Sequence, residues 1–597
     1  MFKQRCFRLL LLASAIATSL SAAAYDFESA GIYYNITGNN TVEVTYSDLD
    51  HNSYSGSISV PETVTNNGTE YSVTKIGEYA FQRSAVTSVS MPESITSIGQ
   101  YACNECGSLE TVVLPTNLDD FSGWCIFRRC RNLKNIAIPE NVTEIPNGTF
   151  ENCLSLAAIT IPQGVGEIGS NAFYGCSSLT SIEIPEGVEY LYEQVFYGCT
   201  ALESVKLPQN LFQIGKNCFS NCGALSDISL PSSIEIIAEG AFQYCQNITT
   251  IVLPDGVASI PESCFDGCSS LESVTIPEGV TTIGKNAFFG CNLNALTLPE
   301  SLDTIGSCAF KNNSSLKSVN IPAKVKTIKN FAFNNCGLTE LVIPEGVQAI
   351  GNYAFYENSL KNLTLPSTIT SIGGGAFGEN NNLQSIICNA VTPPTLGENA
   401  IGSSVKEIKV PISSIAAYKQ ANGWKNFSNY CSGEVVNNGI TYRIDENGAT
   451  ITAAEATLTE ANIPSVVEFE GNQYPVIKIN DRVFSDNINL TSVKIDNGLV
   501  EICRLAFNGC QNLESVVLPE SLTTLGNNAF QYCKSLRAVK IPSKVTTIPD
   551  QCFDGCSLLN SVTIPEGVTA IGDHAFGFCI YNHRTTKTNQ KYPSVNL

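Results

Sequence analysis

The chain has 597 residues, only 15% of them charged, and a formal net charge of −21. Nucleic-acid binding requires a basic surface, so this acidic balance argues against a nucleic-acid partner. The only three histidines are His51, His574 and His583, which leaves little material for imidazole catalysis or for most zinc sites.

The N-terminus has the pattern of a secretory signal peptide. Lys3, Arg5 and Arg8 precede an apolar stretch at residues 9–20, which is too short to span a bilayer. Small residues up to Ala24 predict a signal peptide over residues 1–24. Its removal would delete three cations and take the net charge from −21 to about −24. No later segment has the apolar length of a membrane span, so we expect a protein that is secreted or held at the cell surface.

Residues 25–81 alternate apolar and polar side chains in short runs that turn residues separate. This pattern predicts strand pairs. A stacked array needs an atypical unit at each end, because one face of the terminal core has no neighbour. We therefore interpret residues 25–81 as an N-terminal β cap.

Residues 82–387 repeat one pattern about every 23 residues, L-x-x-[VI]-x-[IL]-P-x-x-[VI]-x-x-I-G-x-x-A-F-x-x-C-x-x-L. The alternating run before proline predicts a short strand, which proline ends because it has no N–H to donate. The I-G segment predicts a shorter extended piece, and the A-F-x-x-C segment predicts a turn. Stacking such coils would bury the apolar residues and pair equivalent strands in parallel, as in a solenoid.

The regular spacing stops at residue 388. Residues 388–431 carry Tyr418, Trp424 and Phe427 and are interpreted as a C-terminal cap over the last coil. Residues 432–484 resemble the opening segment and predict a second N-terminal β cap. A second, short array follows at 485–579. Residues 580–597 lack the repeat pattern, and we expect a disordered or out-of-pattern tail that arises from truncation or a change of reading frame.

The repeat resembles the BspA-like leucine-rich repeats. The segment "IPEGVTTIGKNAFFGC", at residues 276–291, is close to that family's pattern, and the resemblance covers nearly all of residues 61–579. The resemblance implies a curved leucine-rich-repeat solenoid, export, and binding to host proteins or to other cells at a bacterial surface.

Two periodic rows have both a structural and a functional interpretation. The phenylalanine row, represented by Phe173, is interpreted as core packing rather than as an aromatic ladder for sugars. The cysteine row, represented by Cys176, indicates buried thiols, with disulfides and zinc as the alternatives. The C-x-x-x-C pairs are the best local candidates for bridges.

The acid that often follows the proline, such as Glu186, predicts a solvated edge, because one carboxylate per coil does not make a calcium site. The positions two and four residues before each proline alternate with core residues, and we call their exposed surface the strand face. From it we select four candidate ligand-binding residues: Glu183, Lys206, Asp227 and Asn320.

The sequence therefore predicts a non-enzymatic binding or adhesion protein that has no cofactor, catalytic residue or bound metal. Two alternatives remain: a purely structural spacer, and a surface protein that binds glycans or assists carbohydrate utilisation. Glycan binding needs exposed aromatic platforms, and the candidates outside the core row are Trp124, Tyr190, Tyr192 and Trp424.

Overall fold

The computed structural model describes residues 24–48 and 52–579. The predicted tail and the signal peptide, apart from its last residue, lie outside the described residues. The chain divides into two compact units. The first comprises the residues up to Lys361 with Ser371–Asn382 and Gly397–Gly402, and the second comprises Asn362–Thr370, Leu383–Leu396 and the residues from Ser403 onward. Each unit is described by itself.

The first unit opens with paired strands. Antiparallel pairing joins β1 to β2, β2 to β3 and β5 to β6, as expected for alternating runs that tight turns connect. The strands are β1 (Phe27–Ser29), β2 (Ile32–Gly38), β3 (Thr41–Thr45), β4 (Ser55–Ser59), β5 (Thr63–Asn66) and β6 (Thr69–Ile76).

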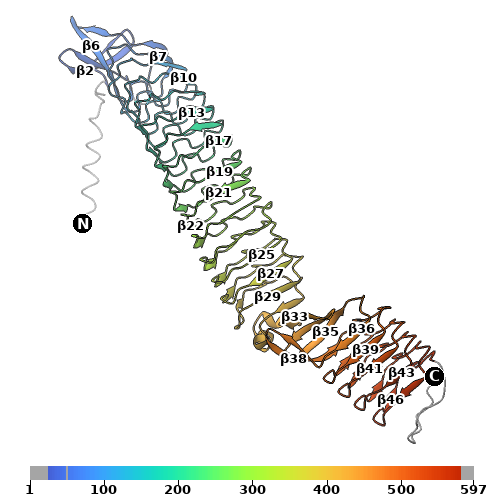
Figure 1. Cartoon of the computed structure of the whole chain (residues 1–597). Helices are drawn as coiled ribbons and strands as arrows, with labels where there is room; N and C mark the ends of the chain where they lie inside the picture. The colour runs from blue at the N-terminus through green and yellow to red at the C-terminus, as the bar shows by residue number, and fades with distance from the viewer. Residues whose placement is uncertain (1–23, 49–51, 580–597) are drawn as a thin grey trace, which may run out of the picture. The chain divides into compact units, whose positions relative to one another are not determined.

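The repeats then form coils that stack on one another (Figure 1). Most coils contribute a strand of two to six residues before the proline and a strand of two residues after it. The first row contains β7 (Ala85–Ser90), β9 (Thr111–Val113), β10 (Asn135–Ile136), β13 (Ser181–Glu183), β15 (Ser204–Lys206), β17 (Asp227–Ile228), β19 (Thr250–Val252), β21 (Ser273–Thr275) and β25 (Leu341–Val342).

The second row contains β8 (Ser97–Ile98), β11 (Glu144–Ile145), β12 (Glu167–Ile168), β14 (Tyr190–Leu191), β16 (Gln213–Ile214), β18 (Ile236–Ile237), β20 (Ser259–Ile260), β22 (Thr282–Ile283), β23 (Thr304–Ile305), β24 (Thr327–Ile328), β26 (Ala349–Ile350) and β28 (Ser371–Ile372). Within each row, the strands that pair with a neighbour do so in parallel; in the second row, for example, Ile145 lies opposite Ile168. The predicted parallel-strand solenoid of the leucine-rich-repeat type is confirmed.

The second unit begins with β27 (Asn362–Leu365), β29 (Ser385–Cys388), β30 (Thr395–Leu396) and β31 (Glu407–Lys409). The only helices among the described residues follow: η1 (Ile412–Ser414), α1 (Ile415–Gln420) and η2 (Trp424–Asn426). Strand β32 (Tyr430–Cys431) then pairs in parallel with β31. None of these helices is long and apolar enough to cross a membrane, and no other helix is present in the described part of the chain.

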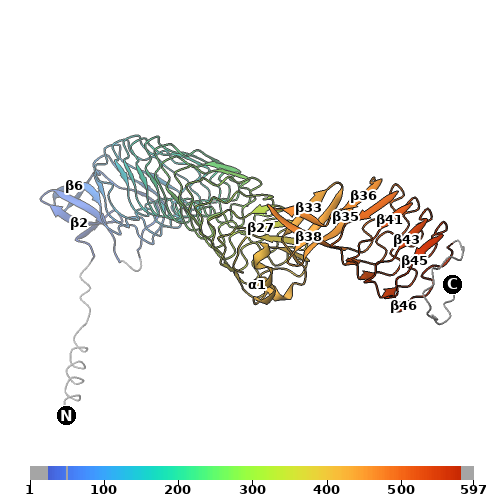
Figure 2. The same cartoon turned by 60° about the horizontal axis from the view of Figure 1, so that its bottom comes forward.

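A further set of strands completes the second unit, and Figure 2 shows β41, β43 and β45 side by side. Antiparallel pairs form from β33 (Gly433–Asn437), β34 (Ile440–Asp445), β35 (Gly448–Ala454), β37 (Val466–Phe469) and β38 (Asn472–Ile479). The parallel coil strands are β36 (Glu460–Ile463), β39 (Ser492–Ile495), β40 (Glu501–Ile502), β41 (Ser515–Val517), β42 (Thr524–Leu525), β43 (Ala538–Lys540), β44 (Thr547–Ile548), β45 (Ser561–Thr563) and β46 (Ala570–Ile571).

The phenylalanine row forms a continuous stack inside the coils. Phe242 and Phe265, for example, have ring centroids 5.4 Å apart with planes inclined by 2°, and both side chains are fully buried. The same arrangement recurs in the second unit, where Phe507 and Phe530 lie 5.0 Å apart. The row therefore packs the core, as the sequence indicates, and its faces are closed to any ligand.

The cysteine row lies beside this stack as free thiols. In most coils the Sγ donates to the carbonyl oxygen of the phenylalanine in the preceding coil; the Sγ of Cys176, for example, lies 3.2 Å from the Phe150 oxygen. Cys130 donates instead to the Cys103 oxygen, because cysteine takes the phenylalanine position there. The chain has 24 cysteines, and all except Cys6 fall within the described residues, where they are unbridged. These hydrogen bonds from thiol to backbone carbonyl link successive coils without a disulfide.

In the first unit, three coils use asparagine in place of this cysteine, and each follows a coil with one residue fewer. In a full-length coil the leucine N–H after the cysteine donates within its own coil, as Leu179 does to the Cys176 oxygen at 3.1 Å. In a shortened coil the Leu338 N–H instead donates to Asn358 Oδ1 of the next coil, at 2.9 Å. Asn358 Nδ2 also donates to the Phe333 oxygen at 2.9 Å, which replaces the thiol contact. Asn313 and Asn380 make equivalent bonds.

Thiol labelling tests this arrangement. Under reducing conditions at pH 8, the native protein should react quickly at no more than the three partly exposed thiols, Cys125, Cys308 and Cys579, because the other described thiols are buried. Denaturation without reductant should release the remainder to the reagent. A low count after denaturation would instead mean that the row is bridged by disulfides.

Candidate functional site

The candidate strand face is built from the outward residues of neighbouring parallel strands. Strands β13 and β15 align so that Glu183 lies opposite Lys206. Lys206 Nζ lies 2.6 Å from Glu183 Oε1, and the two side chains remain 69% and 57% exposed. The hydrogen bond to Glu183 raises the pKa of Lys206, because the carboxylate favours the charged form of the amine. The pair offers adjacent opposite charges to a partner.

The other two predicted residues lie at increasing distance along the same surface. Asp227 in β17 aligns with Ser204 of β15, next to the ion pair. Asn320 forms an isolated β-bridge with Thr297 and lies four coils beyond Asp227 along the array. The structure therefore groups Glu183, Lys206 and Asp227 and leaves Asn320 apart, but all four are exposed.

Exposed valines share the strand face with these polar residues. Val113, Val252 and Val342 stand two residues before their prolines, as Glu183 and Lys206 do, and are 58%, 64% and 67% exposed. Sequence reasoning placed Val252 and Val342 on this surface without selecting them as candidates. Their exposure is the signal that distinguishes them, because a core position would bury an aliphatic side chain. The strand face thus combines apolar contact points with polar ones.

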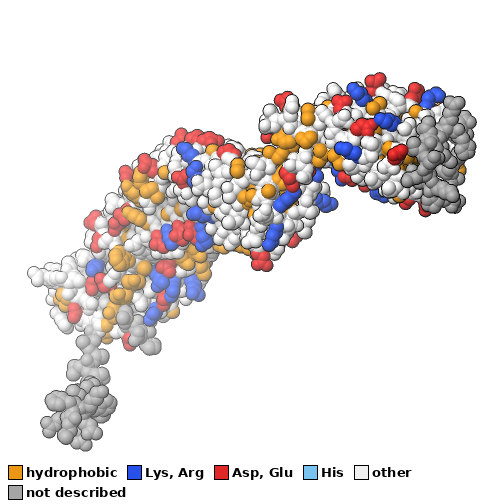
Figure 3. Space-filling view, turned by 90° about the horizontal axis from the view of Figure 1, so that it is seen from below, with side chains coloured by type: hydrophobic (Ala, Val, Ile, Leu, Met, Phe, Trp, Pro, Cys, Tyr) orange, Lys and Arg blue, Asp and Glu red, His pale blue; other side chains and the backbone are white. Residues whose placement is uncertain are grey.

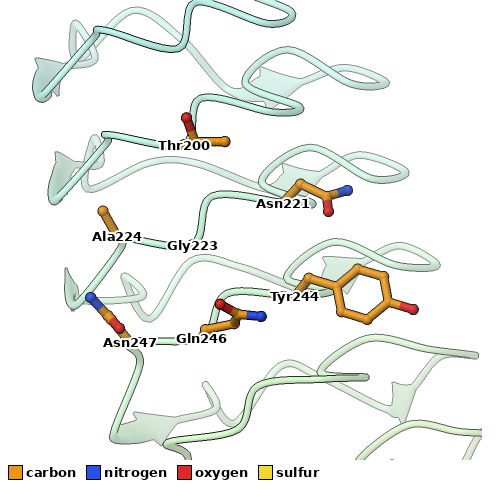
Figure 4. Close-up of a pocket in the computed structure, with 7 residues that line it drawn as sticks. All are labelled: Thr200, Asn221, Gly223, Ala224, Tyr244, Gln246 and Asn247. Atoms are coloured by element: carbon orange, nitrogen blue, oxygen red, sulfur yellow. The ribbon is translucent and has the colours of Figure 1, made fainter.

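A hollow of about 670 Å³ lies at the corner of three successive coils, outside the strand face. Figure 4 shows Tyr244, Asn221 and Gln246 bordering it, and Thr200, Gly223, Ala224 and Asn247 complete the lining. Tyr244 is 43% exposed and lies over Gly267, where an added Cβ would come within 2.3 Å of the ring. Sequence reasoning missed this hollow. The available signal was a tyrosine at a turn position that glycine or asparagine usually occupies.

The acids after the prolines have a structural role that the sequence did not reveal. Glu186 Oε2 accepts the backbone N–H of Gln209 in the next coil at 2.9 Å, and Glu93 accepts that of Thr116 at 3.0 Å. These carboxylates satisfy turn amides that have no partner within their own coil. The acid row therefore links coils while it remains exposed to solvent.

One candidate glycan platform is wrong. Trp424 is fully buried, and its indole N–H donates to the Pro394 oxygen at 2.8 Å, because the closing segment folds this side chain inward. Tyr418 packs against it with ring centroids 5.0 Å apart. Trp124 and Tyr190 do lie at the surface, 57% and 41% exposed.

The remaining polar groups of the described residues do not converge on a reactive centre. No three His, Cys, Asp or Glu side chains in this part of the chain are placed to hold a metal ion. The perturbed groups are mostly thiols and tyrosines of the core, and burial raises the pKa of Cys176 to about 12, for example. The most distinctive accessible feature near the candidate residues is therefore an extended surface.

Comparison with known families agrees with this architecture. The description "BspA type Leucine rich repeat region (6 copies)" matches residues 48–180, 123–249, 235–358, 305–422 and 477–593, which together span more than half of the chain. The chain belongs to the BspA-type leucine-rich repeat family. No curated protein matches this BspA-type chain.

Solved structures similar to this BspA-type chain are also leucine-rich repeat proteins. One from Bacteroides ovatus is 22% identical, with 93% of each chain covered and a TM-score of 0.27. A leucine-rich cell surface protein from Faecalibacterium prausnitzii is 20% identical, with 90% of this chain and 93% of that chain covered and a TM-score of 0.26. The Treponema pallidum (T. pallidum) leucine-rich repeat protein is 27% identical over 33% of this chain and 90% of its own, with a TM-score of 0.29.

Proposed function

We propose that this BspA-type chain is an exported, non-enzymatic binding or adhesion protein of the bacterial cell surface. It recognises proteins of a host or of neighbouring cells through the strand face. The observation that carries the proposal is the row of outward residues on a repeated scaffold, in which Glu183, Lys206 and Val252 differ in chemistry while the core positions beneath them do not. A surface of this kind is where recognition can vary without a change of fold.

Three further features support the proposal. The N-terminal residues have the signal-peptide pattern. The exposed valines provide apolar contact area, while the Glu183–Lys206 pair provides charge that sets orientation and association rate. We also propose that the chain divides into two capped arrays, at residues 25–431 and 432–579. The first and longer array carries all four candidate ligand-binding residues.

Charge reversal tests the strand face. The double variant Glu183→Lys/Lys206→Asp carries the same net charge as the unmodified chain. It places the positive charge on β13 and the negative charge on β15, which exchanges their positions. We expect roughly tenfold weaker binding to the best partner in a screen of the mature chain against extracellular-matrix proteins, which corresponds to about 1.4 kcal/mol. Surface plasmon resonance provides the measurement.

The matched control is Glu239→Lys/Lys216→Asp, which inverts another exposed ion pair, 3.1 Å long, outside the strand face. An equal loss in both double variants would contradict the proposed surface. A second check uses residues 432–597 alone: if this fragment binds as well as the whole chain, the long array is not the binding surface.

Glycan binding is the second candidate function, because Trp124 and Tyr190 remain exposed. A glycan array run beside the protein screen separates the two. Glycan binding without protein binding would make glycan recognition the first candidate function. If the chain binds neither proteins nor glycans, the remaining candidate is a structural spacer.

A further inference from the structure

One stretch of this acidic chain has the opposite charge. Residues 304–339 contain no aspartate or glutamate and five lysines, at positions 311, 317, 324, 326 and 329. The chain as a whole carries a net charge of −21, so the stretch is a local reversal. Figure 3 shows Lys and Arg side chains interspersed with Asp and Glu along the face in view.

These five lysines also lack carboxylate partners. Among the described residues, 15 ion pairs join Lys or Arg to Asp or Glu, and none includes any of the five. In the preceding coil, by contrast, Lys285 Nζ lies 2.7 Å from Glu262 Oε1. Unpaired cations on neighbouring positions produce a positive local potential that attracts anions.

A partly exposed aromatic strip lies beside one of these cations, Lys311, and begins two residues after Lys329. The Phe331 and Tyr353 rings stack with centroids 5.0 Å apart and planes inclined by 12°. Tyr356 meets Tyr353 edge-on at 5.4 Å. Lys311 Nζ lies 4.9 Å from the Phe331 centroid, within cation–π distance.

The backbone holds these rings at the surface. Phe331 and Tyr353 occupy equivalent turn positions with φ of +58° and +56°. The next residue in this row is Gly375, where an added Cβ would come within 2.5 Å of the Tyr353 ring, so the ring lies over a position without a side chain. Tyr353 remains 41% exposed. The result is a short stack of aromatic rings at the surface, in which Tyr353 is the most exposed.

Cys308 occupies the preceding position of this row and is partly exposed. Burial raises the pKa of the Cys308 thiol, and the ammonium groups of Lys311 and Lys285 oppose that rise, which places both cations near the sulfur. At the other end, Glu357 and Glu379 lie close enough to Tyr356 to raise its pKa further, after the larger effect of burial. The cationic end is therefore at Cys308 and the anionic end at Tyr356.

We propose that this basic–aromatic patch, defined as Lys311, Lys329, Phe331, Tyr353 and Tyr356, binds a polyanionic polysaccharide. The apolar C–H groups of sugar rings contact the solvent-exposed parts of Tyr353 and Tyr356, and the carboxylate or sulfate groups of the polymer pair with the ammonium groups of Lys311 and Lys329. The site lies outside the strand face and is independent of protein recognition there.

The test uses the mature chain and four probes: polygalacturonate, dextran sulfate, neutral dextran and polyglutamate. The variant Lys311→Gln/Tyr353→Asn removes one cation and one ring, and asparagine tolerates the positive φ at residue 353. We expect this variant to bind polygalacturonate, dextran sulfate or both at least tenfold more weakly, as measured by isothermal titration calorimetry. We expect no binding of neutral dextran by the unmodified chain. The two anionic polymers distinguish carboxylate from sulfate recognition.

The matched control is Lys540→Gln/Tyr532→Asn in the second unit, which removes an exposed lysine and a tyrosine that lies over Gly555 in the same way. It should bind as the unmodified chain does. Thermal unfolding monitored by circular dichroism checks that both double variants are folded. If either is not, the variant Lys311→Gln/Lys329→Gln replaces it, because it leaves the turn residues intact. This variant should also weaken binding.

Footprinting supplies a second readout. Bound polygalacturonate or dextran sulfate should slow alkylation of Cys308 at least threefold and leave Cys125 and Cys579 unaffected. Polyglutamate binding as tight as that of the polysaccharides, with no effect of Tyr353→Asn, would show an acidic-protein site or simple charge attraction and overturn the proposal. Failure of both anionic polysaccharides to bind, or binding without protection of Cys308, would also overturn it.

Discussion

Both arrays should unfold when the pH rises from 8 to about 10.5 under reducing conditions. Burial raises the pKa of the Cys176 thiol from its usual value near 9 to about 12, and it does the same for Cys268 and Cys510. Other fully buried thiols of the row shift in the same direction for the same reason. The effect is large because the repeat places a comparable thiol in most coils.

The sign follows from proton binding. Unfolded thiols ionise near pH 8.5, whereas the folded thiols keep their protons until about pH 12, so above pH 8.5 the unfolded chain binds fewer protons. The free energy of unfolding therefore falls by up to about 1.4 kcal/mol per pH unit for each such thiol. The contribution is fully present below pH 8.5 and is lost between that value and the folded pKa. Urea titrations at several pH values provide the measurement.

The triple variant Cys176→Ala/Cys199→Ala/Cys222→Ala isolates the cause. It removes three fully buried thiols from successive coils, so the pH dependence of the free energy of unfolding above pH 9 should be shallower by up to about 4 kcal/mol per pH unit. An unchanged slope would mean that other groups, such as buried tyrosines, dominate alkaline unfolding.

Replacing Asn358 by cysteine should destabilise the first unit, although cysteine is the usual residue of that row. The thiol can restore the bond to the Phe333 oxygen, but it offers only a weak acceptor to the Leu338 N–H, which now donates to Asn358 Oδ1. A buried donor without a partner costs about 1–3 kcal/mol. Urea unfolding monitored by circular dichroism measures the loss.

An insertion provides the matched control. Adding one serine after Cys336 returns the preceding coil to the common length, so that the Leu338 N–H can donate within its own coil, as Leu179 does. In that background Asn358→Cys should cost little. If the substitution is equally costly with and without the insertion, or costs nothing in the native length, the proposed compensation is wrong.

The sequence by itself determined the coil and its stacking. Alternation before the prolines marked strands such as β13, and the regular spacing placed Phe265 and Cys176 in buried rows. The same alternation predicted that Glu183, Lys206, Asp227 and Asn320 face solvent, and all four do. These features follow from one coil repeated, because burial within a coil depends only on the period of its apolar residues.

The tertiary structure decided what depends on differences between neighbouring coils. Asn358 looks like a lapse in the cysteine row until the shortened coil before it exposes the Leu338 N–H. Trp424 has the composition of a ligand platform, but the closing segment turns it into the core. The contact of Lys311 with Phe331 joins residues 20 positions apart. A consensus records what the coils share, whereas these contacts arise where adjacent coils differ, and only their register in space brings the unlike residues together.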